Sequence, residues 1–78
     1  MTNFEKYNQT FMATFGVKEQ ELKKLTYQCV DTWDSVGHMD MIAGLEDAFN
    51  IMFETDDIIA FDSYIKGYGL LIKYGIRL

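Results

Sequence analysis

The chain has 78 residues, of which 49% are hydrophobic and 15% aromatic, and its 12 acidic and 7 basic side chains give a formal net charge of −5. A chain of this length forms one small domain, taken as residues 1–78, with no room for a separate catalytic domain around a deep cleft. Its apolar content excludes a disordered tail, and its acidity argues against nucleic acid or an anionic membrane as the main partner. We therefore expect basic proteins as partners.

Cysteine usage and hydropathy indicate a protein of the reducing cytoplasm. The single cysteine, Cys29, cannot form an internal disulfide, and no basic residue beside it in sequence would activate its thiol. We expect it to be a small hydrophobic residue in a loop. The amino terminus lacks a signal-peptide pattern, and nowhere do about 18 apolar residues run together, so we expect no membrane span.

The first predicted element is an amphipathic helix over residues 2–15. Phe4, Tyr7, Phe11 and Phe15 recur at helical spacing, and Gly16 offers a stop. From residue 16 to residue 33 no sustained period exists, so a long loop is predicted, with one helical turn over residues 19–24. Apolar side chains are expected to pin this loop to the core: Leu22, Leu25 and Val30.

A second helix is predicted over residues 34–50, because Asp34 and Ser35 are both good capping residues and the helical pattern then continues unbroken. At about 100° per residue, one side of this helix is apolar and should face the core. That side gathers His38, Ile42, Leu45 and Phe49, with Met41 flanking. Another side mixes acidic with small or apolar residues, namely Val36, Asp40, Ala43 and Asp47, with Met39 and Gly44 at its edges.

The rest of the chain predicts a short helical turn and a last helix. Residues 54–57 should cap the turn over residues 58–60, and Asp62 or Ser63 should cap the last helix. Gly67 and Gly69 lie inside that helix, where each costs about 1 kcal/mol relative to alanine, which suggests close packing or room left for something. The apolar side of the helix is formed by Tyr64, Ile65, Tyr68, Leu71 and Ile72. No segment alternates with period two, so the sequence predicts an all-α protein, a small four-helix bundle of three main helices and a short one.

The negative charge is concentrated in one segment. Residues 31–60 carry eight Asp or Glu and no Lys or Arg, whereas residues 1–30 have a net charge of +1 and residues 61–78 of +2. A charged stretch is usually a solvated face, but like charges along a helix repel and weaken it. A basic partner would offset that repulsion.

The acidic segment also carries a family resemblance. The stretch Trp33-Asp34-Ser35-Val36-Gly37-His38-Met39 resembles the Asp-Ser-Leu motif of acyl carrier proteins and of the related carrier domains of peptide and polyketide synthesis. The resemblance covers about residues 30–75. It continues through Leu45-Glu46-Asp47-Ala48-Phe49, Asp57-Ile58 and Phe61-Asp62-Ser63-Tyr64, and ends near Tyr74-Gly75. Val36 in place of the usual leucine, and Gly37-His38 in place of a polar pair, leave the pathway open.

The resemblance implies a carrier protein and not an enzyme. It implies that a phosphopantetheinyl transferase moves a 4′-phosphopantetheine arm from coenzyme A to Ser35, and that the thiol of the arm carries acyl intermediates of fatty acid or polyketide synthesis as thioesters. The chain would act as a monomer in the cytoplasm. Unpaired N–H groups at the start of a helix favour an anion at this position. The alternative is that Ser35 or Asp34 only caps the helix.

The resemblance also assigns surfaces. Synthases and acyl- or aminoacyl-loading enzymes would dock through basic patches on the second helix, which maps by position onto Asp34, Val36, Asp40, Ala43, Glu46 and Asp47. In carriers the gap between the second and last helices can hold an acyl chain, although its residues are expected to be ordinary core: Met41, Ile42, Leu45, Phe49, Tyr64 and Tyr68. His38 is expected at the mouth of that gap, touching the arm or its cargo.

Other chemistries find little support in the sequence. A Ser35–His38 hydrolase pair would need an orienting acid, an oxyanion hole and a cleft, and no Gly-x-Ser-x-Gly elbow is present. Glu54, Asp56 and Asp57 do not form a calcium-binding loop, so capping and surface charge are predicted for them and no metal site is expected. Two alternatives stay open: an aminoacyl or peptidyl carrier of a nonribosomal or tailoring pathway, and a small acidic helical adaptor with no prosthetic group.

Overall fold

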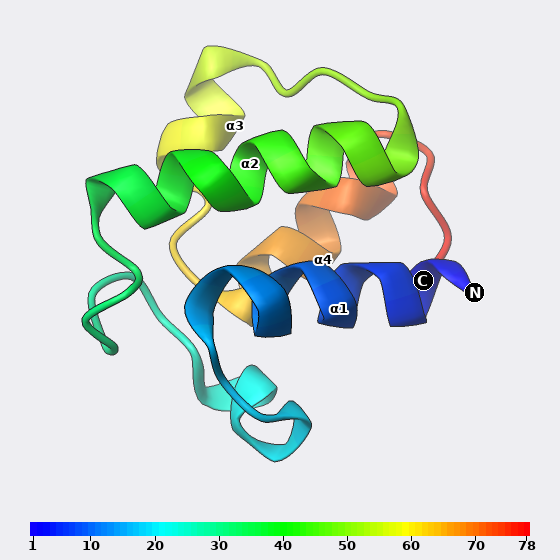
Figure 1. Cartoon of the computed structure of the whole chain (residues 1–78). Coiled ribbons are helices and arrows are strands. Elements are labelled where there is room, and N and C mark those ends of the chain that lie inside the picture. The colour runs from blue at the N-terminus through cyan, green and yellow to red at the C-terminus, as the bar shows by residue number, and fades with distance from the viewer.

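Every regular element of the chain is helical. The computed structural model describes residues 1–78, and Figure 1 shows the helices gathered into one body with both termini at the same end of the molecule. The helices are α1 (Asn3–Phe15), the 3-10 helix η1 (Glu19–Lys24), α2 (Ser35–Phe49), α3 (Thr55–Ala60) and α4 (Tyr64–Lys73). The prediction of an all-α protein is confirmed. None of these helices is long and apolar enough to cross a membrane.

The ends of α1 follow from its sequence. Thr2 is the N-cap: its side chain accepts a hydrogen bond from the Glu5 N–H at 3.1 Å, and the Glu5 carboxylate accepts one from the Thr2 N–H at 2.9 Å. This reciprocal capping box places Thr2 just outside the helix predicted to include it. At the other end Gly16 adopts a left-handed conformation with φ 66°, which glycine reaches without steric cost.

The long segment between α1 and α2 is held down by apolar and backbone contacts. The predicted helical turn is confirmed as η1, and Leu22 and Leu25 are buried, while Val30 is partly buried against the core. The segment also pairs with the start of α4, because the Tyr64 N–H donates to the Leu25 carbonyl at 3.0 Å. The loop is therefore an ordered part of the fold, despite its lack of periodicity.

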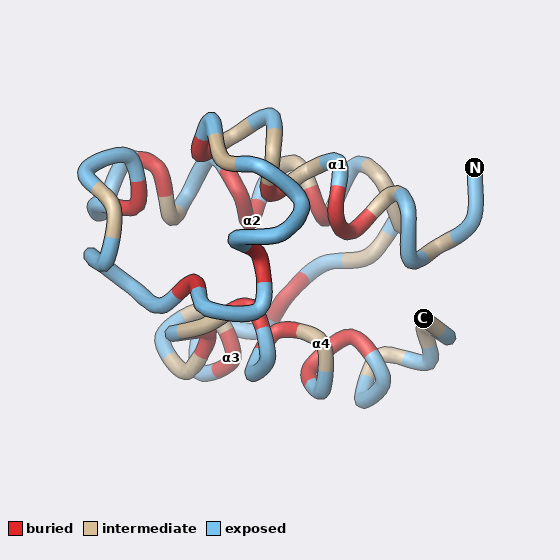
Figure 2. The backbone as a smooth tube through the Cα atoms, turned by 90° about the horizontal axis from the view of Figure 1, so that it is seen from below, coloured by how far each residue is buried: buried red, intermediate tan, exposed pale blue.

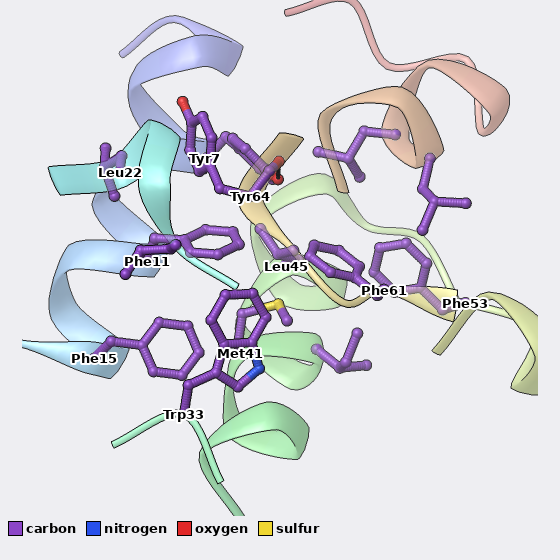
Figure 3. Packing of buried hydrophobic residues seen from close by; sticks show 14 residues of the cluster. Tyr7, Phe11, Phe15, Leu22, Trp33, Met41, Leu45, Phe53, Phe61 and Tyr64 are labelled. Carbon is purple, nitrogen blue, oxygen red and sulfur yellow. Dashed lines mark hydrogen bonds between the residues drawn. The ribbon is translucent and has the colours of Figure 1, made fainter. Parts of the chain in front are cut away.

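Aromatic rings fill the centre of the core (Figure 3). Phe11 lies within 6.0 Å, centroid to centroid, of Tyr7, Phe15, Trp33, Phe61 and Tyr64. Figure 2 marks the buried residues along the backbone, and α1, α2 and α4 each carry several of them. The helices thus pack around one continuous cluster of 14 buried apolar residues.

The predicted core face of α2 is rotated in the structure. Met41, Ile42 and Leu45 are buried, but His38 and Phe49 are only partly buried. The centre of the buried stripe therefore runs closer to Met41 than helical periodicity alone predicted. The direction of the stripe depends on where α1 and α4 lie against the helix, and periodicity does not contain that information.

The prediction that Asp57 is a capping, surface-charged residue is wrong. The helix α3 begins at Thr55 and includes Asp57, which is buried. Its carboxylate accepts hydrogen bonds from Lys73 Nζ at 3.0 and 3.1 Å and from the hydroxyl of Tyr74. This contact ties α3 to the end of α4 and is the only ion pair in the chain.

The Asp57 contact predicts how stability depends on pH. Hydrogen bonds from Tyr74 and Lys73 lower the pKa of Asp57 below its usual value of about 3.9. Because the folded pKa is depressed, this stabilisation is present above the unfolded pKa and is lost as the pH falls through the folded pKa. We expect urea denaturation of Asp57→Asn to show a lower free energy of unfolding near neutral pH and a shallower loss toward acid. Asp56→Asn, an exposed neighbour, should keep the wild-type acid slope; identical slopes for all three proteins would contradict the assignment.

Candidate functional site

Ser35 occupies the first position of α2 and its hydroxyl is unused. Asp34 is the N-cap, with its Oδ1 accepting a hydrogen bond from the Gly37 N–H at 2.8 Å. Ser35 is exposed, its side chain makes no hydrogen bond, and the N–H groups of Ser35 and Val36 donate to no protein acceptor. Of the two capping candidates, Asp34 caps the helix. A hydroxyl and two free N–H groups are left at the positive end of the helix dipole.

Gly37 fixes how the chain enters this helix. It is buried, and a Cβ atom at this position would overlap the backbone carbonyl oxygen of Thr32. The Thr32 hydroxyl in turn donates to the Phe15 carbonyl at 2.8 Å, which anchors the loop to the end of α1. The close approach of the Gly37 backbone to Thr32, two residues after Ser35, therefore helps to fix the position of Ser35. This contact is a structural reason for glycine at position 37, where the sequence differs from the motif it resembles.

His38 connects the start of α2 to two other parts of the fold. The Trp33 indole Nε1–H donates to His38 Nδ1 at 3.0 Å, and His38 Nε2 lies 2.8 Å from the Ile58 carbonyl oxygen. An indole only donates and a carbonyl only accepts, so the proton of the neutral ring sits on Nε2. Both ring nitrogens are engaged, and neither is free to take a proton from Ser35.

A mostly apolar cavity of about 330 Å³ lies beside Ser35. Its walls come from the first turns of α2, from α3 and from the loops that precede α2 and α4. Besides Ser35, the cavity is lined by Tyr27, His38, Met39, Ile58, Ile59, Phe61 and Asp62. The hydrogen bond from His38 to Ile58 holds α3 against α2, so it maintains one wall of this cavity.

Six of the eight lining residues were not predicted from the sequence to belong to a site: Tyr27, Met39, Ile58, Ile59, Phe61 and Asp62. One signal was available, because Ile58 and Ile59 are adjacent in a six-residue helix, where neighbours point about 100° apart and cannot both face the core. Ile59 is indeed 75% exposed. Tyr27 gave no signal, since it reaches the cavity from a loop without periodicity.

The predicted docking residues of α2 share an exposed surface, with one exception. Asp34, Val36, Asp40, Ala43 and Asp47 are exposed, and Val36 is an uncovered apolar side chain. Glu46 is partly buried, and its Oε2 accepts a hydrogen bond from the Phe53 N–H at 2.9 Å. Its carboxylate thus holds the connection between α2 and α3. We use the name acidic face for the exposed residues Val36, Asp40, Ala43 and Asp47.

Six of the seven residues predicted for an arm or acyl pocket lie away from the cavity. Met41, Ile42, Leu45 and Tyr64 belong to the closed core, and Phe49 and Tyr68 pack against it. Only His38 lines the cavity beside Ser35. Figure 3 shows why the interior is closed: aromatic and aliphatic side chains from the surrounding helices meet between α2 and α4.

Buried hydroxyls in this interior are satisfied. The Tyr7 hydroxyl donates to the Tyr64 carbonyl at 2.6 Å, and the Tyr64 hydroxyl donates to the side-chain oxygen of Asn8. Burial raises the pKa of both Tyr7 and Tyr64 above the usual tyrosine value. Both rings therefore stay protonated near neutral pH and act as structural groups.

No set of three or more His, Cys, Asp or Glu side chains comes together in a way that could hold a metal ion. Cys29 is exposed in its loop, where its Sγ accepts a hydrogen bond from the Thr26 N–H.

Comparison with protein-family models, with curated proteins and with solved structures finds no match to this chain.

Proposed function

We propose that the chain is an acyl carrier protein, a four-helix bundle of acyl-carrier type that bears a 4′-phosphopantetheine arm on Ser35. The observation that carries the proposal is the unused, exposed hydroxyl of Ser35 at the first position of α2, where Asp34 already performs the capping. This separates the serine from the structural role that is its main alternative. The resemblance of residues 33–39 to the carrier motif supports the same assignment.

The residues around Ser35 fit such a group. The free N–H groups of Ser35 and Val36 and the helix dipole favour a phosphodiester at the hydroxyl. The bound arm would supply a terminal thiol that holds an acyl group as a thioester. The chain's own residues present the hydroxyl to a transferase, and the adjoining cavity offers apolar surface from Met39, Ile59 and Phe61.

Intact-protein mass spectrometry tests this proposal. After incubation with coenzyme A and a broad-specificity phosphopantetheinyl transferase, the wild-type chain should gain one phosphopantetheine mass and Ser35→Ala should gain none. Ser63 is the only other serine and caps α4, so Ser63→Ala is a matched control: it should cost about 1 kcal/mol of stability and still gain the mass. A wild-type chain that stays unmodified while a known carrier is loaded would leave the acidic adaptor as the better description.

The acidic face would serve as the docking surface for partner enzymes with basic patches, including the transferase and the synthases or ligases that load and unload the arm. Its carboxylates on Asp40 and Asp47 form no ion pair, and Val36 supplies uncovered apolar surface between charged neighbours. Contacts of this kind are steered by charge and weakened by salt, which suits a monomeric cytoplasmic carrier that must leave each enzyme.

Charge reversal tests the docking surface. Asp40→Lys with Asp47→Lys should slow loading at low salt by about tenfold or more, because the change turns attraction into repulsion, while the helical circular dichroism stays unchanged. Glu54→Lys with Asp56→Lys makes the same charge change at exposed residues outside α2 and outside the cavity beside Ser35, and should have a smaller effect. Equal loading rates for both variants and the wild type would show that the acidic face is only solvated.

The group carried on the arm distinguishes an acyl carrier from an aminoacyl or peptidyl carrier. An acyl carrier should accept acyl groups from an acyl-loading ligase, whereas an aminoacyl or peptidyl carrier should be charged by an adenylating enzyme with an amino acid. Mass spectrometry of the loaded arm distinguishes the two, and both outcomes require Ser35.

A further inference from the structure

A second, partly apolar surface runs along α4 from η1 to the last residues of the chain. The start of α2, by contrast, lies at the opposite end of the molecule from the two termini (Figure 1). Three adjoining cavities of about 460, 320 and 560 Å³ follow one another between the first turn of α1, η1, α4 and the last residues. The first two share Phe4 and Tyr64, and the second and third share Tyr68. They form one continuous depression, which we name the α1–α4 groove.

Three apolar side chains of this groove are exposed to solvent. Phe4 is 41% exposed, Ile65 59% and Ile72 58%. Ile65, Tyr68 and Ile72 are spaced by three and four residues, so they share one side of α4 and span about 10 Å along it. Phe4 contacts Tyr68 edge to face, with ring centroids 6.5 Å apart, and extends this row onto α1. A row of exposed apolar side chains that joins two helices marks an interaction surface.

The charges around the groove are positive. Lys23 lines its η1 end and Arg77 lines its opposite end, while Lys66 is next to Ile65 in sequence but outside the lining. None of these three side chains is in an ion pair. Glu19 is the one acidic residue in the lining. In a chain of net charge −5, this groove is therefore opposite in sign to the acidic face.

We infer that the α1–α4 groove binds an acidic amphipathic helix of a partner protein. Two apolar side chains of such a helix, two turns apart, would match Ile65 and Ile72, and flanking carboxylates would face Lys23 and Arg77 at the two ends of the groove. A second copy of the chain is a poorer occupant: it could offer only the acidic face, and that head-to-tail contact would build rings or open filaments in place of a monomer. The inference uses no property of Ser35, so it stands independently of the proposed carrier function.

Nuclear magnetic resonance of the ¹⁵N-labelled full chain tests the inference. The probe is a synthetic helical peptide of about 14 residues, roughly 20 Å long, with leucines at helical spacing and glutamates between them. It should shift the amide signals of Lys23, Ile65, Tyr68 and Ile72. The same peptide with every glutamate replaced by lysine should leave these signals in place, because it repels the basic rim.

Substitutions in the α1–α4 groove test whether the peptide binds there. Lys23→Glu with Arg77→Glu, at the two basic residues of the lining, should weaken binding of the glutamate peptide by about tenfold or more, and Ile72→Ser should do the same through the apolar row. These side chains are exposed, so the fold should persist. Lys24→Glu, next to Lys23 but outside the lining, should bind like the wild type.

Several outcomes would overturn the inference. They are the absence of shifts in the groove with the glutamate peptide, equal binding of the lysine peptide there, and shifts of the same signals on concentrating the protein alone, which would make a second copy the occupant. Broadening of these signals by vesicles of anionic phospholipid, with no response to the glutamate peptide, would identify a membrane surface in place of a protein. Loading of Ser35 should be unaffected by the groove variants.

Discussion

Replacement of Trp33 by alanine should lower the free energy of unfolding by about 3–5 kcal/mol, the usual cost of removing a large buried aromatic side chain. Trp33 is fully buried, stacks on Phe15 at 4.8 Å between centroids and meets Phe11 edge to face at 5.7 Å. Small domains of this size have a total stability of about 4–12 kcal/mol. The variant should therefore be partly unfolded or close to it at 37 °C, as urea denaturation will show.

Trp33→Phe separates the packing of this side chain from its hydrogen bond. Phenylalanine keeps much of the aromatic contact but leaves His38 Nδ1 without the indole donor. We expect a smaller loss of stability, together with a change in the His38 ring signals in the proton spectrum, because the neutral tautomer is no longer fixed from that side. A Trp33→Ala protein within about 1 kcal/mol of the wild type would contradict the central position of this ring.

The second large effect is expected from Gly67→Ala. A Cβ atom at Gly67 would overlap the tip of the Phe61 ring and lie 2.5 Å from the Tyr7 hydroxyl oxygen. Both rings are buried, so neither can move aside freely. Overpacking of this kind costs about 1–3 kcal/mol, measurable as a lower midpoint of urea denaturation. Because Phe61 also lines the cavity beside Ser35, the same change should alter that cavity.

Gly69→Ala is the matched control for this prediction. Gly69 is exposed two residues along the same helix, and a Cβ atom there would meet nothing within 4 Å. Alanine should stabilise the helix by about 0.5–1 kcal/mol, because glycine loses more conformational freedom on folding. The two substitutions should thus have opposite signs, and equal effects would show that the approach of Phe61 to α4 is not as close as described.

The packing around Gly67 and Gly69 could not be predicted from the sequence. Both predicted either close packing or open room, and the structure gives one of each: Gly67 is packed and Gly69 is open. Helical periodicity shows that the two glycines lie about 200° apart around α4, but it does not show which of them faces a neighbouring side chain. Which of the two meets an aromatic ring depends on Phe61, a residue in the loop before the helix, whose position no local pattern specifies.

Phe4 makes the same point for the core. Its spacing with Tyr7, Phe11 and Phe15 predicted one apolar face of α1, and three of the four residues are buried, but Phe4 is exposed. The pattern gave the direction of the side chains correctly. It could not show that α4 leaves the first turn of α1 uncovered, and that the α1–α4 groove results.

The sequence by itself determined the helices, most of their ends and the place of Ser35 at the start of α2, because caps and helical hydrogen bonds join residues within about four positions of one another. Tertiary structure alone decided the rest. It paired Asp57 with Lys73, 16 residues away, brought Tyr27 and Ile58 to the cavity beside Ser35, and closed the space between α2 and α4 with side chains. These contacts depend on the relative positions of packed helices, which follow from the fit of all the core side chains together and not from any one segment.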